Sequence, residues 1–240
     1  MPDWVMKVDK FASPTARRIH QRGLIKKASF LSGPKLDGMI QVESDLEATL
    51  CMLLMLDPRV VAVSPQPATF DMISGKRYSD KETLKAAQQP GGYKPKIYTP
   101  DFEATMVCRR SVFLEAKHTS WLEDKPEYLG YPGTMASWGL KLLIATEAIL
   151  QAAAAQNIRM LKSVMDDAPG PENAERAALL DDDGLRFAQI ASLPGFSDTE
   201  VLRLIVAGDL SFDVAGVPLT KNTVLKPSRG SKAHLQVFDL

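Results

Sequence analysis

Cysteine is scarce in this chain, and neither sign of charge is in excess. Only Cys51 and Cys108 occur among 240 residues, and they do not have a zinc-ligand spacing. Both lie in apolar runs, so we expect buried free thiols. The 29 Lys and Arg residues balance 29 Asp and Glu residues. Overall charge therefore gives no support to nucleic-acid binding, which would have to depend on local basic patches.

Long apolar runs are also missing. No run reaches the roughly 18 apolar residues of a membrane-spanning helix, and no signal-peptide pattern is present. We therefore expect a cytoplasmic protein that does not associate with membranes. Hydrophobic residues make up 45% of the chain and charged residues 24%. This composition predicts a folded core, in one large domain or in one domain with a small appendage.

Charge is balanced overall but segregated along the sequence. Residues 1–40 hold eight Lys and Arg against three Asp. Within them, residues 16–23 could form a basic helix or arm that follows phosphates, or a solvated terminus. Residues 214–238 contain Lys and Arg but no acid, whereas residues 166–183 are acidic. The two basic segments are the candidates for a nucleic-acid contact.

Hydrophobic periodicity and turn residues predict a mixed α/β chain. The expected elements, in chain order, are a turn at 30–34, a helix at 44–56, strands at 60–63 and 68–73, a short helix at 81–88, a hairpin at 102–117, a polar loop at 119–133, a long helix at 134–156, a strand at 158–165, helices at 174–192 and 197–207, and strands at 212–214 and 217–219. Residues 167–171, rich in Pro and Gly, are the best linker candidate. The last two helices and strand pair suggest a small winged-helix-like module, a shape that docks on DNA or on protein.

The predicted hairpin carries the residues with the clearest chemistry. Asp101 follows a proline at the start of its first strand, and Glu115 and Lys117 end the second. Because side chains alternate along a strand, Glu115 and Lys117 share one face and Ala116 takes the other. The turn then brings Asp101 close to both. Two carboxylates beside one ammonium group suit a hard divalent cation and an oriented water molecule. An edge strand with solvated charges would carry the same residues.

Two titratable residues near this motif, Glu47 and His118, each allow a structural and a functional interpretation. Glu47 lies three residues after Ser44, which is the spacing of a capping box. Alternatively, Glu47 points from the first turn of its helix into the site as a third acid, and Glu43 competes for that role. His118 could assist at the site, although a loop histidine with a local hydrogen bond is the commoner outcome.

The Pro-Asp and Glu-x-Lys pattern resembles the PD-(D/E)xK nuclease superfamily, in which two acids hold magnesium and the lysine positions or activates the attacking water. A longer ordered set resembles TnsA, the endonuclease subunit of the heteromeric transposases of Tn-seven-type transposons. This set covers roughly residues 40–120, half of the chain. Its five elements are Ser44-Asp45-Leu46-Glu47, Asp57-Pro58 before a Val-rich strand, Gln66-Pro67, Tyr98-Thr99-Pro100-Asp101-Phe102 and Leu114-Glu115-Ala116-Lys117.

The resemblance implies a fold class and a domain organisation. The expected fold is α/β, with a restriction-endonuclease-like mixed sheet flanked by helices and a small winged-helix-like C-terminal domain. Residues 1–40 would be a basic arm, residues 41–167 the nuclease domain, and residues 168–240 the C-terminal domain with a basic tail.

The resemblance also implies a site. Its catalytic residues would be Glu47, Asp101, Glu115 and Lys117. Asp101, Glu115 and the carbonyl of Ala116 would bind Mg²⁺, for which Mn²⁺ substitutes. Glu47 would bind a second ion or orient a water molecule, and Lys117 would activate that water and stabilise charge on the phosphate.

The expected reaction is hydrolysis of phosphodiesters at the 5′ ends of a transposon. The implied partners are transposon-end DNA, a DDE-type transposase similar to TnsB that cuts the 3′ ends, and an AAA+ ATPase regulator similar to TnsC. Two alternatives stay open. A stand-alone restriction or repair nuclease would cut duplex DNA without partners. A catalytically inert DNA-binding or assembly subunit would use the same basic segments and the C-terminal module.

Overall fold

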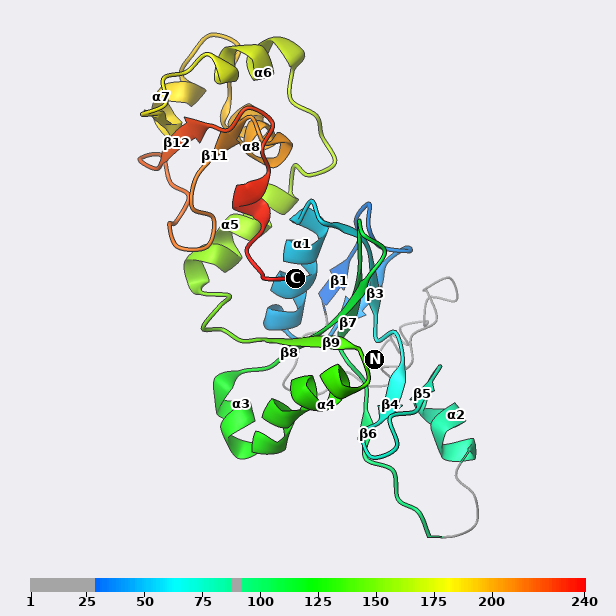
Figure 1. Ribbon diagram of the computed structural model, residues 1–240. Coiled ribbons are helices and arrows are strands. Elements are labelled where there is room, and N and C mark those ends of the chain that lie inside the picture. The colour runs from blue at the N-terminus through cyan, green and yellow to red at the C-terminus, as the bar shows by residue number, and fades with distance from the viewer. Residues whose placement is uncertain (1–28, 88–91) are drawn as a thin grey trace, which may run out of the picture.

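A four-stranded mixed sheet lies at the centre of the computed structural model, which describes residues 29–87 and 92–240 (Figure 1). Its strand order is β3-β7-β8-β9, with β7 antiparallel to both of its neighbours and β9 parallel to β8. The strands are β3 (Val60–Pro65), β7 (Phe102–Met106), β8 (Ser111–Ala116) and β9 (Lys141–Ala145). The chain is thus a mixed α/β structure whose multi-strand sheet is flanked by helices, as the sequence predicts.

Side-chain alternation gives the sheet two buried faces. Val112, Leu114 and Ala116 of β8 belong to the core under α1 (Asp45–Leu56), which packs in turn on α5 (Ala152–Lys162). Phe113 points the other way and meets Phe70 edge to face, with ring centroids 5.3 Å apart. A strand buried on both faces carries a continuous apolar run, which in β8 extends from Val112 to Leu114.

The connection between the parallel strands β8 and β9 is helical. A parallel pair needs a crossover rather than a tight turn. Its elements are α3 (Thr119–Asp124), the 3₁₀ helix η1 (Pro126–Gly130) and α4 (Tyr131–Ser137), of which α4 packs against β9. The polar loop predicted at 119–133 is therefore wrong.

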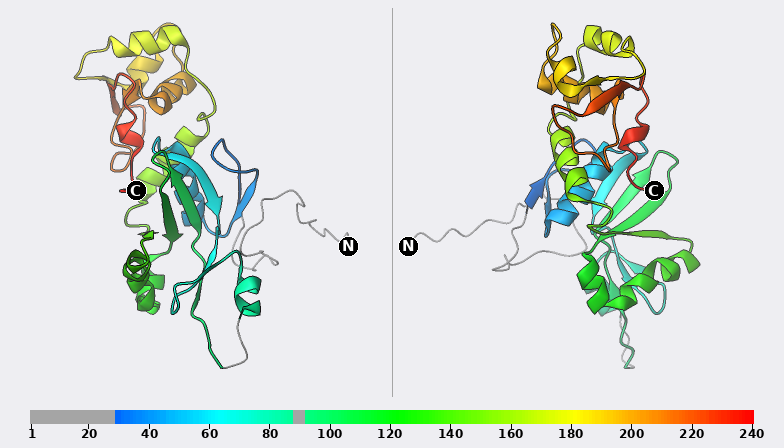
Figure 2. Two further views of the ribbon diagram at one scale, coloured as in Figure 1. Left: turned by 45° about the vertical axis from the view of Figure 1, so that its right-hand side comes forward. Right: turned by 90° about the vertical axis from the view of Figure 1, so that its left-hand side faces the viewer.

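Smaller elements extend the molecule on either side of the central sheet (Figures 1 and 2). The pair β1 (Ser29–Leu31) and β2 (Ile40–Val42) lies beside α1. A second small sheet has the order β5-β4-β6, with α2 beside it. Its elements are β4 (Thr69–Asp71), β5 (Arg77–Tyr78), α2 (Lys81–Ala86) and β6 (Ile97–Tyr98). Residues 30 and 31 of the turn predicted at 30–34 lie in β1, and the chain turns just after them, where the Leu36 N–H donates to the Gly33 carbonyl. The basic arm predicted at 16–23 lies outside the described residues.

The C-terminal region forms the opposite end of the molecule (Figure 2). Its elements are α6 (Pro171–Ala178), β10 (Leu185–Arg186), α7 (Phe187–Ala191), α8 (Asp198–Ala207), β11 (Leu210–Ser211), β12 (Val224–Pro227) and the 3₁₀ helix η2 (Ala233–Leu235). The helix α8 agrees with its prediction and begins at Ser197, whose side chain accepts from the Glu200 N–H. The predicted helix at 174–192 is broken by a turn in which the Gly184 N–H bonds the Asp181 carbonyl. The strands predicted at 212–214 and 217–219 are absent from this described region, where β12 pairs with β10 and β11 instead.

The region between residues 134 and 165 differs most from its prediction. The sequence predicts a helix at 134–156 and a strand at 158–165. Instead, β9 lies inside the first range, and α5 begins in the first range and extends through residue 162 of the second. The helix α4 ends before Gly139, whose φ of +76° favours glycine. Short apolar runs fit a buried strand or a helix equally well, and here the partner strand β8 decides the outcome. No helix in the described ranges is long and apolar enough to cross a membrane.

Two sets of contacts join the C-terminal region to α5 and to the central sheet. Asn157 of α5 is fully buried, and its amide donates to the carbonyls of Val214 and Val217 at 2.9 and 2.8 Å. Its side-chain oxygen accepts from the Leu219 N–H at 2.7 Å. Arg59, which directly precedes β3, donates to the Phe238 carbonyl. Lys141 donates to the neighbouring Asp239 carbonyl at 3.0 Å. One continuous apolar core includes residues from both parts.

Replacing Asn157 with Ala should destabilise the protein by about 2–5 kcal/mol, because two carbonyls and one N–H lose a buried partner. Urea unfolding measures this change. Asn222→Ala is the control, since Asn222 is exposed in the same region. Equal unfolding midpoints for the two variants would show that the Asn157 contacts do not hold the region.

Candidate functional site

The site lies where β7 begins and β8 ends. The register pairs Phe102 with Leu114, so Asp101, just before β7, sits beside the last residues of β8. One carboxylate oxygen of Asp101 accepts from the Ala116 N–H at 2.8 Å and from Lys117 Nζ at 3.3 Å. The hairpin predicted from the sequence is confirmed, and it fixes the orientation of Asp101 through the backbone of the opposite strand.

Lys117 lies between two acids. Its Nζ is 2.5 Å from a Glu115 carboxylate oxygen and 3.3 Å from Asp101. It also donates to the Ala116 carbonyl at 3.2 Å. The three N–H donors of the ammonium group are thus matched by three protein oxygens. Asp101, Glu115 and Lys117 meet at one point, as the sequence predicts.

Glu115 is the most enclosed member of this group, with 3% of its surface exposed. Its second oxygen accepts from the Tyr98 hydroxyl at 3.0 Å. Burial and the charge of Glu115 raise the pKa of Tyr98 well above its ordinary value, so that hydroxyl remains a donor. Both oxygens of a buried carboxylate therefore have partners, as its burial requires.

Burial dominates the electrostatics of the site. Burial and the nearby charge of Asp101 raise the pKa of Glu115 to about 8. Burial also raises the pKa of Asp101, although Lys117 and the Ala116 N–H act in the opposite direction. For Lys117, burial disfavours the ammonium form, but Glu115 and Asp101 together outweigh it and raise the pKa. When both acids are ionised, the site holds two carboxylates against one ammonium group, and this imbalance favours a further cation.

Glu47 has a structural role in the first turn of α1. Its N–H donates to the Ser44 hydroxyl at 3.1 Å, and that hydroxyl contacts a Glu47 carboxylate oxygen at 3.1 Å. The other oxygen accepts from the Glu43 N–H at 2.9 Å, so the reciprocal bond of the predicted capping box goes to the residue before the cap. Burial and then the charge of Asp101 raise the pKa of Glu47, against the Glu43 hydrogen bond and the charge of Lys117. Glu47 is therefore within electrostatic reach of the site, and its catalytic role stays a prediction.

No family model matches this chain, and no curated protein matches it. The resemblance to TnsA therefore depends on the motif residues alone.

The oxygen atoms of the site fit a hard divalent cation in chemistry. Asp101, Glu115 and the Ala116 carbonyl are the donor types that Mg²⁺ prefers. When both acids are ionised, Lys117 balances only part of their charge. Three acids do not converge, however. Within residues 29–87 and 92–240, no group of three His, Cys, Asp or Glu side chains is placed to hold a metal ion. Any ion would therefore depend on the two hairpin acids and the carbonyl.

His118 and Cys108 do not take part in this group. His118 is exposed, and its Nδ1 lies 3.4 Å from a Glu147 carboxylate oxygen, the local contact expected of a loop histidine. Cys108 is exposed in the hairpin turn, so its predicted burial is wrong, whereas Cys51 is buried as predicted. The apolar run before Cys108 ends in a turn, and a turn leaves its side chains in solvent.

Two aromatic residues of the site had no assigned role in the sequence. Tyr98 contacts Glu115 from β6, and Trp121 of α3 lies beside Lys117, with Nζ 5.5 Å from its ring centroid. Trp121 follows Lys117 by four residues, and Tyr98 precedes Asp101 by three. This closeness in sequence was the available signal, but the role of each ring depends on the fold around it.

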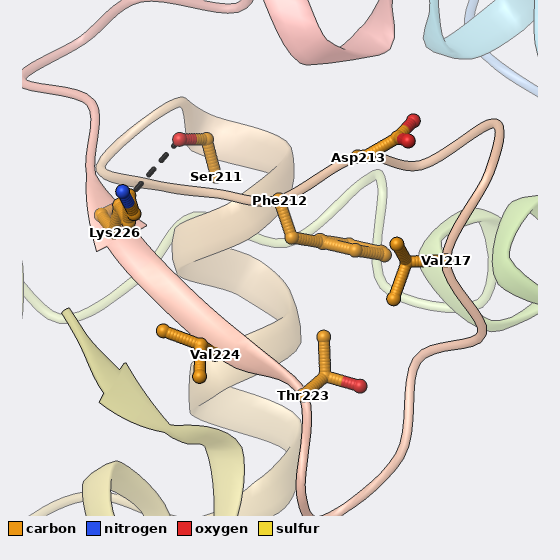
Figure 3. A pocket seen from close by; sticks show the side chains of 7 residues that line it. All are labelled: Ser211, Phe212, Asp213, Val217, Thr223, Val224 and Lys226. Carbon is orange, nitrogen blue, oxygen red and sulfur yellow. Dashed lines mark hydrogen bonds between the residues drawn. The ribbon is translucent and has the colours of Figure 1, made fainter. Parts of the chain in front are cut away.

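The C-terminal region contains a cavity (Figure 3). It has a volume of about 440 Å³ and is lined by Ser211, Phe212, Asp213, Val217, Thr223, Val224 and Lys226. Asp213 is occupied in holding its own loop, since it accepts from the N–H groups of Ala215 and Gly216. The Ser211 hydroxyl donates to the carbonyl of Lys226, its partner on the neighbouring strand. None of the candidate site residues lines this cavity.

The raised pKa of Glu115 predicts how stability depends on pH. Between its ordinary value of 4.5 and about 8, the folded state holds a proton that the unfolded state releases. The stability from that proton is complete below the lower value and is lost as pH rises to the upper one. Without divalent ions, the free energy of unfolding should therefore fall more steeply over this range in the wild type than in Glu115→Gln.

Denaturant titrations at several pH values give this comparison. Each unit of pKa difference corresponds to about 1.4 kcal/mol. Glu103→Gln serves as the control, because Glu103 lies on β7 and pairs with Arg77 instead of Lys117. Parallel curves for the wild type and Glu115→Gln would contradict the assignment.

Proposed function

We propose that this protein is a magnesium-dependent DNA endonuclease that cuts the 5′ ends of a transposon together with a partner transposase. One observation carries the proposal: Asp101, Glu115 and Lys117 come together at one end of the sheet, beside the Ala116 carbonyl. The ordered motifs that resemble TnsA supply the transposon context. The coarse architecture is compatible with a restriction-endonuclease-like core.

The proposed roles follow from the contacts of each group. Asp101 and Glu115 would hold the ion together with the Ala116 carbonyl, and Glu47 would assist from α1. When bound, Mg²⁺ would supply positive charge to the scissile phosphate and favour the attack of water. The Ala116 N–H holds Asp101 in one orientation, and Tyr98 does the same for Glu115. Such fixed donors and acceptors need little rearrangement when charge develops.

Lys117 must exchange a partner before it can act. All three of its donors face protein oxygens at 2.5 to 3.3 Å. When those carboxylate oxygens are engaged elsewhere, the ammonium group can turn one N–H toward the phosphate or the attacking water. The charges of Glu115 and Asp101 outweigh the effect of burial and keep Lys117 protonated, so it serves as a donor and not as a base.

The proposed partners are the transposon-end DNA, a TnsB-like DDE-type transposase and a TnsC-like AAA+ regulator. The C-terminal region, proposed as winged-helix-like, would contact DNA or protein. Its surface includes exposed Lys221, Lys226 and Arg229, although Lys221 and Arg229 are paired with Asp198 and Asp182. These ion pairs weaken the region as a phosphate-binding patch.

A second candidate function is an inert DNA-binding or assembly subunit. The specific observation in its favour is that Lys117 already neutralises part of the charge of both hairpin acids, while the Glu47 oxygens are occupied at the helix cap. Such a core would bind no Mg²⁺. Calorimetric titration of the wild type with Mg²⁺ separates the two candidates, with Asp101→Asn as the variant expected to lose binding.

In a reaction reconstituted with the partner transposase, Asp101→Asn and Lys117→Ala should each lower 5′ cleavage by about 100-fold or more. Cleavage of the 3′ ends by the partner should continue, because that reaction belongs to another subunit. Strand-specific gels measure both cuts. Glu103→Gln, on the same strand β7, should cut normally. Undiminished 5′ cleavage by Asp101→Asn or Lys117→Ala would refute the proposal.

A further inference from the structure

Four aromatic rings link the two ends of the candidate site. Tyr98, whose hydroxyl contacts Glu115, packs on Tyr131 with ring centroids 4.9 Å apart. Tyr131 packs on Tyr128 at 4.5 Å, and Tyr128 on Trp121 at 4.5 Å. The ring of Trp121 then lies 5.5 Å from Lys117 Nζ, which bonds Glu115. We call these four residues, Tyr98, Tyr128, Tyr131 and Trp121, the aromatic wall.

The wall is built by the crossover between β8 and β9. Trp121 lies on α3, Tyr128 on η1 and Tyr131 at the start of α4. The start of α3 is fixed by Glu147, whose carboxylate accepts from the Thr119 N–H at 3.0 and 3.1 Å and from the Thr119 hydroxyl. These contacts fix the start of α3, and with it the position of Trp121, four residues after Lys117 in the sequence.

The surroundings of Lys117 differ between its two sides. The lysine side chain is 21% exposed, so solvent reaches part of this side chain. Glu115, Asp101 and the Ala116 carbonyl contact this group on the strand side. The Trp121 ring is the aromatic surface beside it, and a cation lying near an indole ring is attracted by the negative face of that ring.

We propose that Trp121 is a positioning residue for Lys117. Its ring keeps the ammonium group against Glu115 and Asp101 and limits the access of bulk water. The inference rests on the proposed function in one respect, namely that Lys117 acts in phosphodiester cleavage. No contact between Trp121 and DNA is part of the proposal. The same segment exposes three acids, Glu123, Asp124 and Glu127, against one lysine, Lys125, whose Nζ lies 5.0 Å from the centroid of the Trp121 ring. This net negative charge disfavours phosphate.

The test compares Trp121→Leu with Trp121→Phe. Leucine removes the aromatic face, whereas phenylalanine keeps one. Trp121→Leu should lower kcat for 5′ cleavage by about 10-fold with KM nearly unchanged, because Lys117 is misplaced but no substrate contact is lost. Trp121→Phe should retain most of kcat. Trp138→Leu is the matched control, since Trp138 is likewise half-buried but its ring lies against Gly75.

A second readout does not depend on cleavage. An amine-specific acetylating reagent, followed by peptide mass mapping, reports how accessible Lys117 is. Lys117 should react about 10-fold faster in Trp121→Leu than in the wild type, in Trp121→Phe or in Trp138→Leu. Unfolding curves establish that all four proteins are folded at the assay temperature.

The two readouts separate the two proposals. Faster acetylation of Lys117 together with a lower kcat supports the positioning role. Unchanged acetylation in folded Trp121→Leu overturns it, and so does faster acetylation with an unchanged kcat. If Lys117→Ala itself cleaves normally, the proposed nuclease function fails. The acetylation rates then still decide whether Trp121 holds Lys117 in place.

Discussion

The ion-pair group of Lys117 with Asp101 and Glu115 is the interaction on which the arrangement of the site depends. A carboxylate as enclosed as Glu115 would be costly without compensation, because its charge is removed from water. Lys117 and the Tyr98 hydroxyl provide this compensation from different segments of the chain. The elements around the site can therefore be understood as what holds these few polar atoms together.

The register of one hairpin satisfies most of this requirement. Pairing Phe102 with Leu114 places Asp101 beside Ala116 and Lys117. A slip of one residue would exchange the two faces of β8, moving Glu115 toward the apolar core under α1. Apolar packing on both faces prevents that slip, since Leu114 contacts the α1 side and Phe113 meets Phe70 on the other. Ordinary core packing thus protects the geometry of the charged group.

The sequence predicted the features that depend on neighbouring residues. The helix α1 with Ser44 at its start, the hairpin of β7 and β8, and the meeting of its acids with the lysine follow from local patterns. Prediction failed where distant partners decide. The run Lys141–Ala145 is a strand because β8 lies beside it, and no local signal separates it from the helix that was expected.

The same limit applies to individual side chains. The sequence places Tyr98 and Trp121 near the motif, but a tyrosine or tryptophan at those positions is equally compatible with a role in the apolar core. Their contacts with Glu115 and Lys117 arise only when β6 and the crossover close over the end of β8. Glu47 shows the opposite case, because its capping role is readable from spacing alone.

The helix α5 has a consequence for how the two ends of the molecule communicate. It packs on both α1 and α8. The side chain of its Asn157 forms hydrogen bonds with the backbone of the loop that contains Val214 and Leu219. The C-terminal region is therefore held by packing contacts as well as by the chain connection. A displacement of the C-terminal region would therefore act on α5, and through α5 on α1, the helix whose first turn carries Glu47.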